Sequence, residues 1–418
     1  MREFFEGIPA VTHQGSYASY PFAFRFYDPE RIVAGRPMRE HFRFALPVGE
    51  LGRFGLTGSD ILLASMELLH KLGISYYTMT DRVLAKEGAS LRESHARLDE
   101  VTAAMGSLQE TFQVRALRVA ADFSHPRYCY GAATSSCADI YAFAAAQVKK
   151  SMETAHLLGA QYFCFSGGQE IRGGFYASVD DALESANLLR FLARVGEYAG
   201  ALGFPGRLCV RPFIASKMNF TKIDDEISDE NESFVEEHYW PSAAHALDFL
   251  RSAGLHAFGV DMPLAGPLSD LRMLLQAQRL GLFEARPMYG GGLVPLMARV
   301  QLELLRLGVA SGGMVLDLRS AVPCSTPEDY VIHCIMYMDA CACGLLLAQR
   351  ILLDGRVEQF RRERYSGFGY GIGQAAAENR ADLTALEQHA LAKGDVQAAT
   401  NRIEYMENVF QGMLCRGV

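Results

Sequence analysis

Arginines at the ends of short apolar runs are the residues of this sequence whose type and position best suit chemistry. Arg118 lies within one such run, Arg211 and Arg286 each directly follow another, and Arg82 lies close to the end of a fourth. A planar guanidinium binds a carboxylate or phosphate through two parallel hydrogen bonds. The four arginines therefore predict a binding site for an anionic ligand.

Internal pairing is the alternative interpretation of the same arginines. The carboxylates of Asp81, Glu170, Asp261 and Asp317 are available to neutralise them. A buried guanidinium without another counter-ion must find such a partner, because an unpaired buried charge is strongly destabilising. The sequence leaves the ligand site and the internal network open as alternatives.

Three carboxylates are candidates for a catalytic base, namely Asp317, Asp81 and Glu170. If one of them removed a proton beside a carbonyl group, nearby arginines could stabilise the enolate that forms. Tyr289 could donate a hydrogen bond to an oxyanion, or it could simply pack against its neighbours.

A second possible acid–base pair is Asp122 with His125, which lie three positions apart after another apolar run. A histidine beside a carboxylate is a common general base. An ordinary loop histidine is the alternative. The spacing alone does not separate these two interpretations.

Alternating strands and helices must position these side chains. Short apolar, β-branched or aromatic runs predict eight strands, at Phe42–Leu46, Ser75–Met79, Ala116–Ala120, Tyr162–Phe165, Leu208–Val210, Ala257–Asp261, Leu282–Ala285 and Met314–Leu316. Helical patterns lie between them, at Ser59–Leu72, Leu91–Phe112, Ala138–Leu158, Asp180–Leu202, Ser242–Ser252, Pro267–Leu280 and Leu293–Leu307. Glycines such as Gly281 and Gly308 follow the helices as C-caps. This order predicts an α/β fold, a (β/α)8 TIM barrel.

Two segments interrupt the alternation. Residues 221–241 are acidic and polar, and they follow the fifth strand on the face where barrel active sites lie, so they could form a lid or a solvated insertion. Residues 326–418 continue as helices after the barrel has closed. We therefore expect a barrel over residues 1–325 and a C-terminal helical arm over 326–418. An appendage of this size commonly clasps a neighbouring subunit.

Composition excludes several classes of function. The 418 residues are 50% hydrophobic with a net charge of −8, so the chain has a globular composition and no basic surface for nucleic acid. The nine cysteines lack the spacing of a disulfide framework, which indicates a reducing compartment. We find no signal segment and no apolar run long enough to span a bilayer, and we expect a cytoplasmic protein without a membrane partner.

Several motifs resemble the xylose isomerase family. The resemblance begins with Phe24-Arg-Phe-Tyr-Asp-Pro-Glu and Met38-Arg-Glu-His-Phe-Arg-Phe, continues through Ser124-His-Pro-Arg-Tyr and Thr326-Pro-Glu-Asp, and ends with Leu386-Glu-Gln-His-Ala-Leu. It implies a (β/α)8 barrel with an arm that embraces a neighbouring subunit, usually in a tetramer. It also implies two divalent cations that bind the open-chain sugar while a hydride moves between adjacent carbons.

The family's metal-binding residues are mostly replaced here. Where the resemblance implies ligands, an active-site histidine or a wall tryptophan, this sequence has Thr80, Arg118, Arg211, Pro263, Gly266 and Arg286. Asp317 alone corresponds to a retained ligand, and one carboxylate cannot hold a hard divalent cation against water. Phe54 corresponds to the phenylalanine that the family inserts into a neighbour's site. We therefore predict no metal and no other cofactor.

Three functions follow from this pattern. The first is a xylose isomerase-like barrel that has lost the two-metal site and binds a small anionic carbohydrate-like ligand at the strand ends, through Arg118, Arg211, Arg286, Arg82, Phe54 and Tyr289. The second is a non-catalytic scaffold or partner subunit of an active relative. The third is a metal-independent isomerase, epimerase or lyase acting on a sugar phosphate or sugar acid. In each case we expect a homodimer or homotetramer built through the arm.

Overall fold

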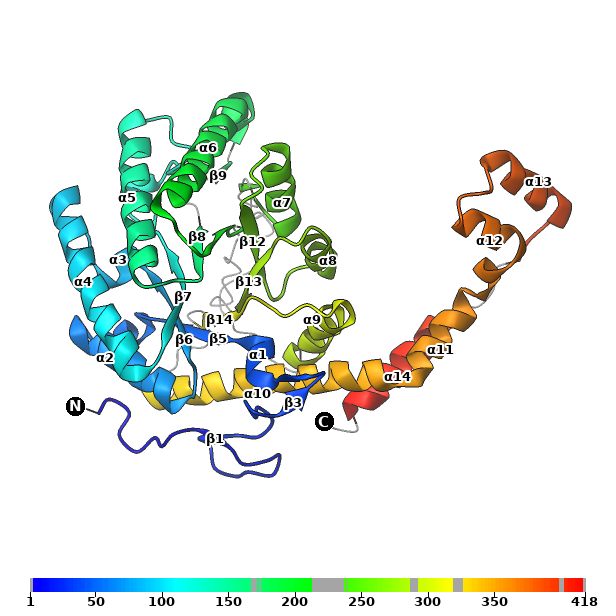
Figure 1. Cartoon of the computed structure of the whole chain (residues 1–418), viewed down its shortest axis with the longest axis horizontal. Coiled ribbons are helices and arrows are strands. Elements are labelled where there is room, and N and C mark those ends of the chain that lie inside the picture. Colours follow the sequence, from blue (N-terminus) through cyan, green and yellow to red (C-terminus); the bar gives the residue numbers. More distant parts are fainter. Residues whose placement is uncertain are drawn as a thin grey trace, which may run out of the picture. The chain divides into compact units, whose positions relative to one another are not determined.

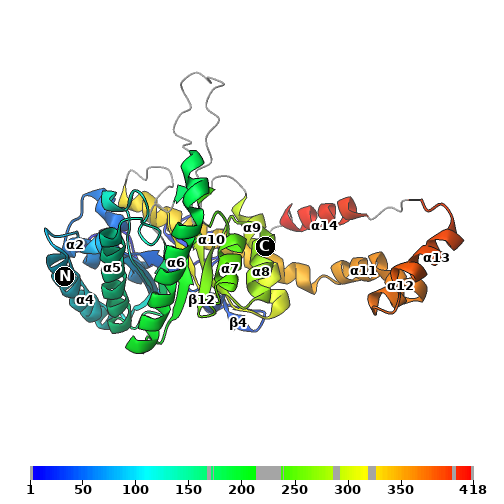
Figure 2. The same cartoon turned by 90° about the horizontal axis from the view of Figure 1, so that it is seen from above.

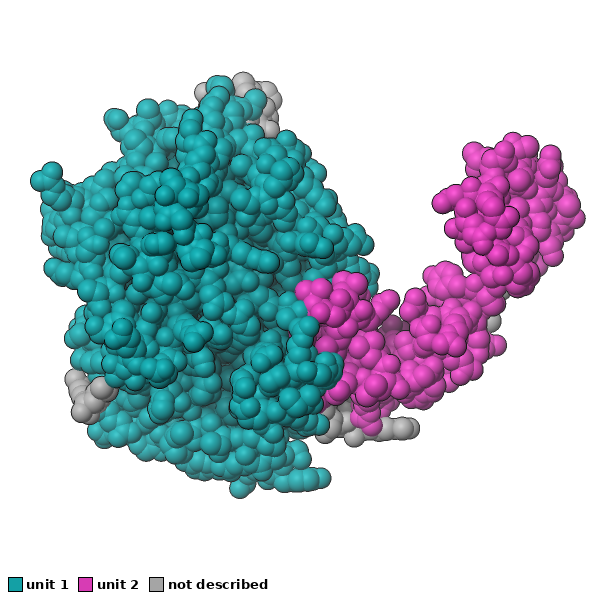
Figure 3. Space-filling view, viewed as in Figure 1, with its two compact units in different colours: residues 1–290, 310–340 teal, residues 291–309, 341–418 magenta. Residues whose placement is uncertain are grey.

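The chain folds into two compact units in the computed structural model (Figure 3). One comprises residues 1–290 and 310–340, and the other comprises residues 291–309 and 341–418. The structure describes residues 3–166, 171–172, 174–212, 237–238, 240–285, 292–318, 326–397 and 402–415. The first unit contains all strands of the barrel.

A closed barrel of parallel strands forms the centre of the first unit (Figure 1). In chain order its strands are β5 (Phe44–Pro47), β6 (Tyr76–Thr80), β7 (Arg115–Ala120), β8 (Tyr162–Phe165), β10 (Arg207–Val210), β12 (Phe258–Pro263), β13 (Leu280–Ala285) and β14 (Met314–Leu316). Pairing of Met314 with Phe44 joins the last strand to the first. The predicted (β/α)8 barrel is therefore confirmed.

Helices alternate with these strands along the chain. Those of the first unit are α1 (Met38–Phe42), α2 (Ser59–Lys71), α3 (Asp81–Leu84), α4 (Leu91–Phe112), α5 (Ala138–Leu157), α6 (Gly174–Leu202), α7 (Ala243–Ser252) and α8 (Leu268–Gln276). Figure 2 shows α5 and α6 side by side on the outside of the barrel. Helix α9 (Leu293–Leu307) belongs to the second unit.

The remaining elements are short or C-terminal. The short strands are β1 (Thr12–His13), β2 (Ala23–Phe24), β3 (Ile32–Val33), β4 (Arg36–Pro37), β9 (Ile171–Arg172) and β11 (Glu237–His238), and the 3-10 turns are η1 (Glu50–Phe54), η2 (Pro126–Tyr128) and η3 (Ser366–Gly369). A C-terminal helical extension follows, with α10 (Pro327–Leu353), α11 (Gly355–Arg364), α12 (Gly371–Ala377), α13 (Leu383–Lys393) and α14 (Ile403–Cys415).

The barrel interior is filled by side chains from several of its strands. This buried cluster contains Ala45, Leu117, Ala120, Tyr162, Cys164, Cys209, Leu282 and Val315. Tyr162 and Cys164 are two positions apart on β8, as the period-2 geometry of a strand requires. Leu117 and Ala120 are three apart on β7, whose pairing with β6 shifts register next to Leu117. The filled interior leaves room for a ligand only near the ends of the strands.

Two local expectations need correction. Phe42 ends helix α1 and does not begin the first strand, which starts at Phe44. Gly281 lies inside β13 and is not a C-cap, because α8 ends at Gln276 and Gln278 supplies the residue with positive φ. Gly308 does take the left-handed conformation expected after α9, with φ of 64°.

Helix α10 is long and apolar enough to cross a membrane, the one such helix in the part of the chain that the structure describes. This corrects the sequence expectation that no such run exists. However, 78% of its most apolar window is buried within the protein, as in the core helix of a globular protein. Its Asp339 accepts backbone hydrogen bonds at 2.8–2.9 Å from Arg25, Phe26 and Tyr27, so the helix also anchors the N-terminal segment.

Candidate functional site

A cavity of about 370 Å³ opens at the C-terminal ends of several barrel strands. Its lining includes the residues after β5, the end of β6, and three side chains that the sequence singled out, Arg118, Arg211 and Asp317. Arg118 reaches the cavity from within β7, whereas Arg211 and Asp317 directly follow β10 and β14. The structure thus brings these three predicted residues together at one place.

The two arginines share a carboxylate that the sequence analysis missed. Glu284, near the end of β13, accepts hydrogen bonds on Oε1 from Nη1 of Arg118 and, at 2.9 Å, from Nη2 of Arg211. Nη1 of Arg118 also lies 3.2 Å from Oδ2 of Asp261. Because Arg118, Asp261 and Glu284 are all buried, this network holds charges where water cannot screen them.

Burial and pairing act on Arg118 in opposite directions. Burial alone would lower the pKa of its guanidinium, but the adjacent Glu284 and Asp261 carboxylates outweigh it and raise that pKa above its ordinary value. Arg118 therefore stays charged, as arginine does in proteins generally. The internal pairing of arginines that the sequence left open is present, because Arg118 and Arg211 both pair with Glu284. Both arginines also line the cavity.

Local backbone geometry places Asp261 inside the barrel. The register between β12 and β13 shifts between Val260 and Met262, so Asp261 turns inward and its Oδ1 accepts the backbone N–H of Leu282 at 2.8 Å. A Cβ atom at position 281 would collide with this same carboxylate oxygen. Gly281 is therefore required by the close approach of Asp261 and not by a helix end.

Two cysteines border this network, and burial raises the pKa of both the Cys164 and Cys209 thiols well above the usual range. A thiol that remains protonated is a poor nucleophile. The site therefore contains guanidinium donors and a carboxylate, but no activated thiol among the residues that the structure describes.

Asp81 is held in a separate buried network. Its Oδ1 accepts the backbone N–H groups of Arg82 and Asp122 at 2.7 and 2.8 Å, and its Oδ2 accepts from Gln147 and Ser151 at 3.0 and 2.7 Å. These donors tie α3 and the loop after β7 to α5. Asp81 does not line the cavity, so its role as a base remains a prediction, and its contacts favour a structural role.

Arg82 also points away from the lining of the cavity. All three of its guanidinium nitrogens are buried, and the described part of the chain gives them no hydrogen-bond partner. The backbone explains this placement. Helix α3 starts at Asp81, and Val83, the residue after Arg82, takes the position that lines the cavity.

Phe54 stands beside an arginine that the sequence analysis did not select. Its ring lies 6.2 Å from the Tyr330 ring, centroid to centroid, and it borders a second cavity of about 530 Å³. Arg53 lies over both rings and lines the first cavity. For Arg53, the signal available in the sequence was a basic residue shortly after the first strand. For Glu284, it was a single charged residue within an apolar run.

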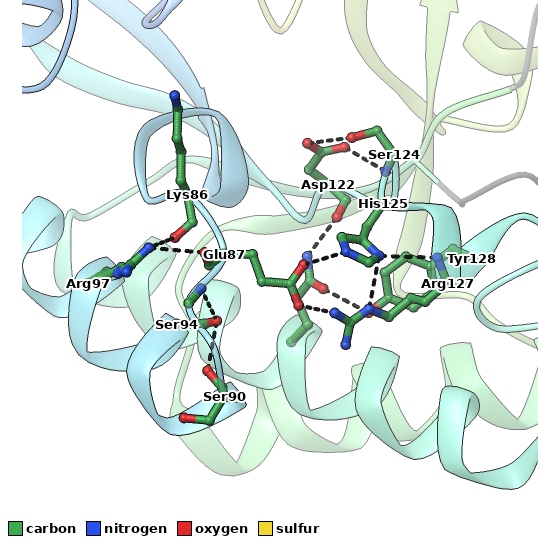
Figure 4. A network of polar contacts seen from close by, with 12 residues as sticks. Lys86, Glu87, Ser90, Ser94, Arg97, Asp122, Ser124, His125, Arg127 and Tyr128 are labelled. Carbon is green, nitrogen blue, oxygen red and sulfur yellow. Dashed lines mark hydrogen bonds and ion pairs between the residues drawn. The ribbon is translucent and has the colours of Figure 1, made fainter.

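Asp122 and His125 do not contact each other as an acid–base pair, and His125 is a loop histidine, the alternative that the sequence left open. Figure 4 shows His125 beside Glu87, with 3.4 Å between Nε2 and the carboxylate, while its Nδ1 accepts from the backbone N–H and Nε of Arg127, each at 3.1 Å. The Asp122 carboxylate instead accepts from Ser124. These contacts order an exposed loop at the end of β7.

Three of the predicted site residues, Glu170, Arg286 and Tyr289, lie outside the described residues. Most of the acidic insertion at 221–241 does so as well. Within the described ranges, no group of three or more histidine, cysteine, aspartate or glutamate side chains is arranged to hold a metal ion.

Comparison with known proteins gives one consistent result. The family model of the XylA2 C-terminal domain matches residues 361–414. The chain is 31% identical to a xylose isomerase from Caldanaerobacter subterraneus subsp. yonseiensis, with 99% of each chain covered. It is 30% identical to a xylose isomerase from Thermotoga maritima, covering 100% of this chain and 99% of the relative.

Among solved structures, an L-ribulose 3-epimerase aligns with a TM-score of 0.50 and 11% sequence identity, covering 74% of this chain and 96% of the epimerase. At that identity the likeness establishes the barrel fold and nothing about activity.

Proposed function

Because the chain belongs to the xylose isomerase family, we propose that it binds a sugar-like ligand with an anionic group at the strand ends, without divalent cations. The observation that carries this proposal is that Arg118 and Arg211 both line the cavity and are braced by the same carboxylate of Glu284. Fixed guanidinium groups are preorganised donors for carboxylate, phosphate and hydroxyl oxygens.

The donor set of this cavity does not fit the two cations that the family uses. The carboxylates of Asp261 and Glu284 already accept from guanidinium groups. Asp317 shares the cavity with Arg118 and Arg211, which would repel a divalent ion. A hard cation needs six or more oxygen ligands, most of them not committed elsewhere. We therefore derive no step that passes through a metal.

The size of the cavity supports a small ligand. A volume of about 370 Å³ lies at the lower end of the range of roughly 300–1,000 Å³ found for small-molecule sites. A monosaccharide derivative suits such a cavity, whose lining includes Arg118 and Arg211 as donors and Asp317 as an acceptor, together with Thr78 and Thr80.

Proton transfer is a second candidate function, favoured by the placement of Asp317. This carboxylate lines the same cavity as Arg118 and Arg211. If the carboxylate removed a proton beside a sugar carbonyl, the two guanidinium groups could stabilise the enolate, as an isomerase or epimerase requires. In D2O, Asp317→Asn would abolish deuterium incorporation next to the carbonyl while retaining ligand binding.

The test of the main proposal is ligand binding by calorimetry, with sugar acids, sugar phosphates and neutral sugars in the presence of EDTA. We expect Arg211→Ala to weaken binding at least tenfold, since a hydrogen bond to a charged group contributes about 1.5–3 kcal/mol. Arg207→Ala is the matched control, because Arg207 is the exposed first residue of the same strand. Binding that disappears in EDTA, or that is unchanged in Arg211→Ala, would contradict the proposal.

A further inference from the structure

Arg53 is the guanidinium at this cavity that has no carboxylate partner within the described residues. It lies in the turn η1 (Glu50–Phe54), is exposed, and lines the cavity together with Arg118 and Arg211. The latter two are paired with Glu284. The contacts of Arg53 are instead aromatic, since its guanidinium carbon lies 5.0 Å from the Phe54 centroid and 4.7 Å from the Tyr330 centroid.

Stacking on aromatic rings holds a guanidinium without neutralising it. The attraction comes from the negative face of each ring, so the net charge of the arginine is retained. The N–H donors lie in the guanidinium plane and remain available to a ligand in that plane. The Tyr330 ring is only 1% exposed, so it gives Arg53 a rigid surface to lie against.

The three arginines of the cavity should therefore act differently on a ligand. Arg118 and Arg211 have their charges balanced by Glu284 and Asp261, so they mainly offer hydrogen bonds, which hydroxyl and carboxylate oxygens can both accept. Arg53 forms no direct ion pair among the described contacts, although the Glu50 and Asp317 carboxylates line the same cavity, so its charge is balanced less fully than theirs. A charge that is not fully balanced distinguishes an anionic ligand from a neutral one of the same shape.

We propose that Arg53 is the residue that selects an anionic oxygen group, carboxylate or phosphate, on the ligand of this cavity. Phe54 and Tyr330 act as positioning residues that hold its guanidinium by stacking. This inference rests on the proposed function, because it assigns the charge selectivity of the same site. It moves that selectivity from the buried arginines of the barrel to an exposed residue of η1.

Three probes with one sugar scaffold test the assignment, namely D-glucose, D-glucuronate and D-glucose 6-phosphate, measured by calorimetry. The wild type should bind at least one of the two anions tenfold or more tightly than glucose, and the preferred anion identifies the group. Arg53→Met, which keeps the length and apolar stem but removes the charge, should reduce this preference to less than threefold. Arg53→Lys should restore part of it.

Further variants separate charge selection from a structural role. Arg115→Met is the matched control, because Arg115 is an exposed arginine at the start of β7, and it should leave all three affinities unchanged. Phe54→Leu should lower the preference partially by removing one stacking face. Raising the salt concentration should reduce the anion preference of the wild type and have little effect on Arg53→Met, since salt screens an exposed charge.

The outcomes distinguish this inference from the function on which it rests. If Arg53→Met keeps the full preference for the anion while Arg211→Ala loses binding, the inference about Arg53 is wrong and the proposed function stands. If none of the three probes binds, or the anions bind no more tightly than glucose, both fail. A loss of affinity for glucose equal to that for the anions would show a structural effect and would also overturn the assignment.

Discussion

Glu284 determines how much positive charge the barrel presents to a ligand. Its carboxylate contacts both Arg118 and Arg211, and it is itself buried. Taking such charges out of water is unfavourable, so the group is stable only while each charge keeps its partner. In this network, a change at one position therefore alters stability and ligand affinity together.

Glu284→Gln should destabilise the protein and strengthen anion binding. The amide cannot neutralise either guanidinium, and breaking a buried ion pair on one side typically lowers the free energy of unfolding by about 3–5 kcal/mol. Arg211 would lose its ion pair with Glu284 and face the cavity with an uncompensated charge. Urea unfolding measures the first effect, and calorimetry with the sugar acid measures the second.

Glu197→Gln is the control for this change. Glu197 forms an exposed pair with Arg194 three residues away on α6, so its replacement should change neither stability nor ligand affinity appreciably. Equal stability of Glu284→Gln and the wild type would mean that the network does not hold the barrel mouth together.

The sequence located part of this site because side chains at strand ends must meet in a parallel barrel. That geometry brought Arg118, Arg211 and Asp317 together. It did not reveal which way a side chain turns after its strand. Asp81 follows β6 as expected, yet it points into a network with α5, and the neighbouring backbone decides that direction.

At the scale of elements, periodicity was most informative where it was long or strongly apolar. Helix α4 and strand β8 have the predicted bounds, Leu91–Phe112 and Tyr162–Phe165. The start of the first strand was wrong because Phe42 adjoins the apolar run but ends a short helix, whose buried residues Met38, His41 and Phe42 have the i, i+3, i+4 spacing of one helix face. Tertiary contacts decide such ambiguous short runs.

One of those contacts makes helix α1 sensitive to pH. His41 is buried, and Nε2 lies 2.8 Å from the carbonyl oxygen of Val33 in β3. Burial is the largest influence and lowers the pKa of His41, and the charge of Arg36 lowers it further. The pKa of His41 is therefore lower in the folded protein than the usual value of about 6.5 in the unfolded chain. As the pH falls, the unfolded chain binds the proton first, which stabilises the unfolded state.

The free energy of unfolding should therefore fall as the pH decreases from 7.5 to 5.5, by at most about 1.4 kcal/mol per pH unit for this one group. His41→Gln retains a donor for Val33 but does not titrate, so its stability should vary less over this range. Urea unfolding at the two pH values measures the difference. His70→Gln, at an exposed position of α2, should keep the wild-type dependence, and the same slope in His41→Gln would contradict the assignment.

At the scale of the whole molecule, the C-terminal helices expose several large apolar side chains. Helices α11, α12 and α13 bury no residue within the chain. Helices of 7–11 residues are marginal in water without a packing partner. The large exposed side chains of this region include Phe368, Tyr370, Leu383 and Leu391, with Tyr370 70% and Leu383 85% exposed.

This surface suits burial against a second copy of the chain, in the homodimer or homotetramer that we propose. We expect light scattering to give a multiple of the 46.1 kDa chain mass. The variant Phe368→Ser/Tyr370→Ser/Leu383→Ser should shift this mass toward that of the monomer, because stable interfaces depend on a few buried apolar anchors. The variant should keep the helical circular dichroism signal that comes from the barrel, since none of the three residues is buried in the monomer.

Point variants are preferable to removal of the arm for this test. Val357, Val409, Phe410 and Met413 pack against Ala298, Leu347 and Ile351 in the second unit, so truncation would expose an existing core. Tyr17→Ser is the control, because Tyr17 is 99% exposed in the N-terminal segment and its loss should leave the assembly intact. A wild type that is monomeric at micromolar concentration, or a triple variant that keeps the wild-type mass, would show that this apolar surface does not join two copies.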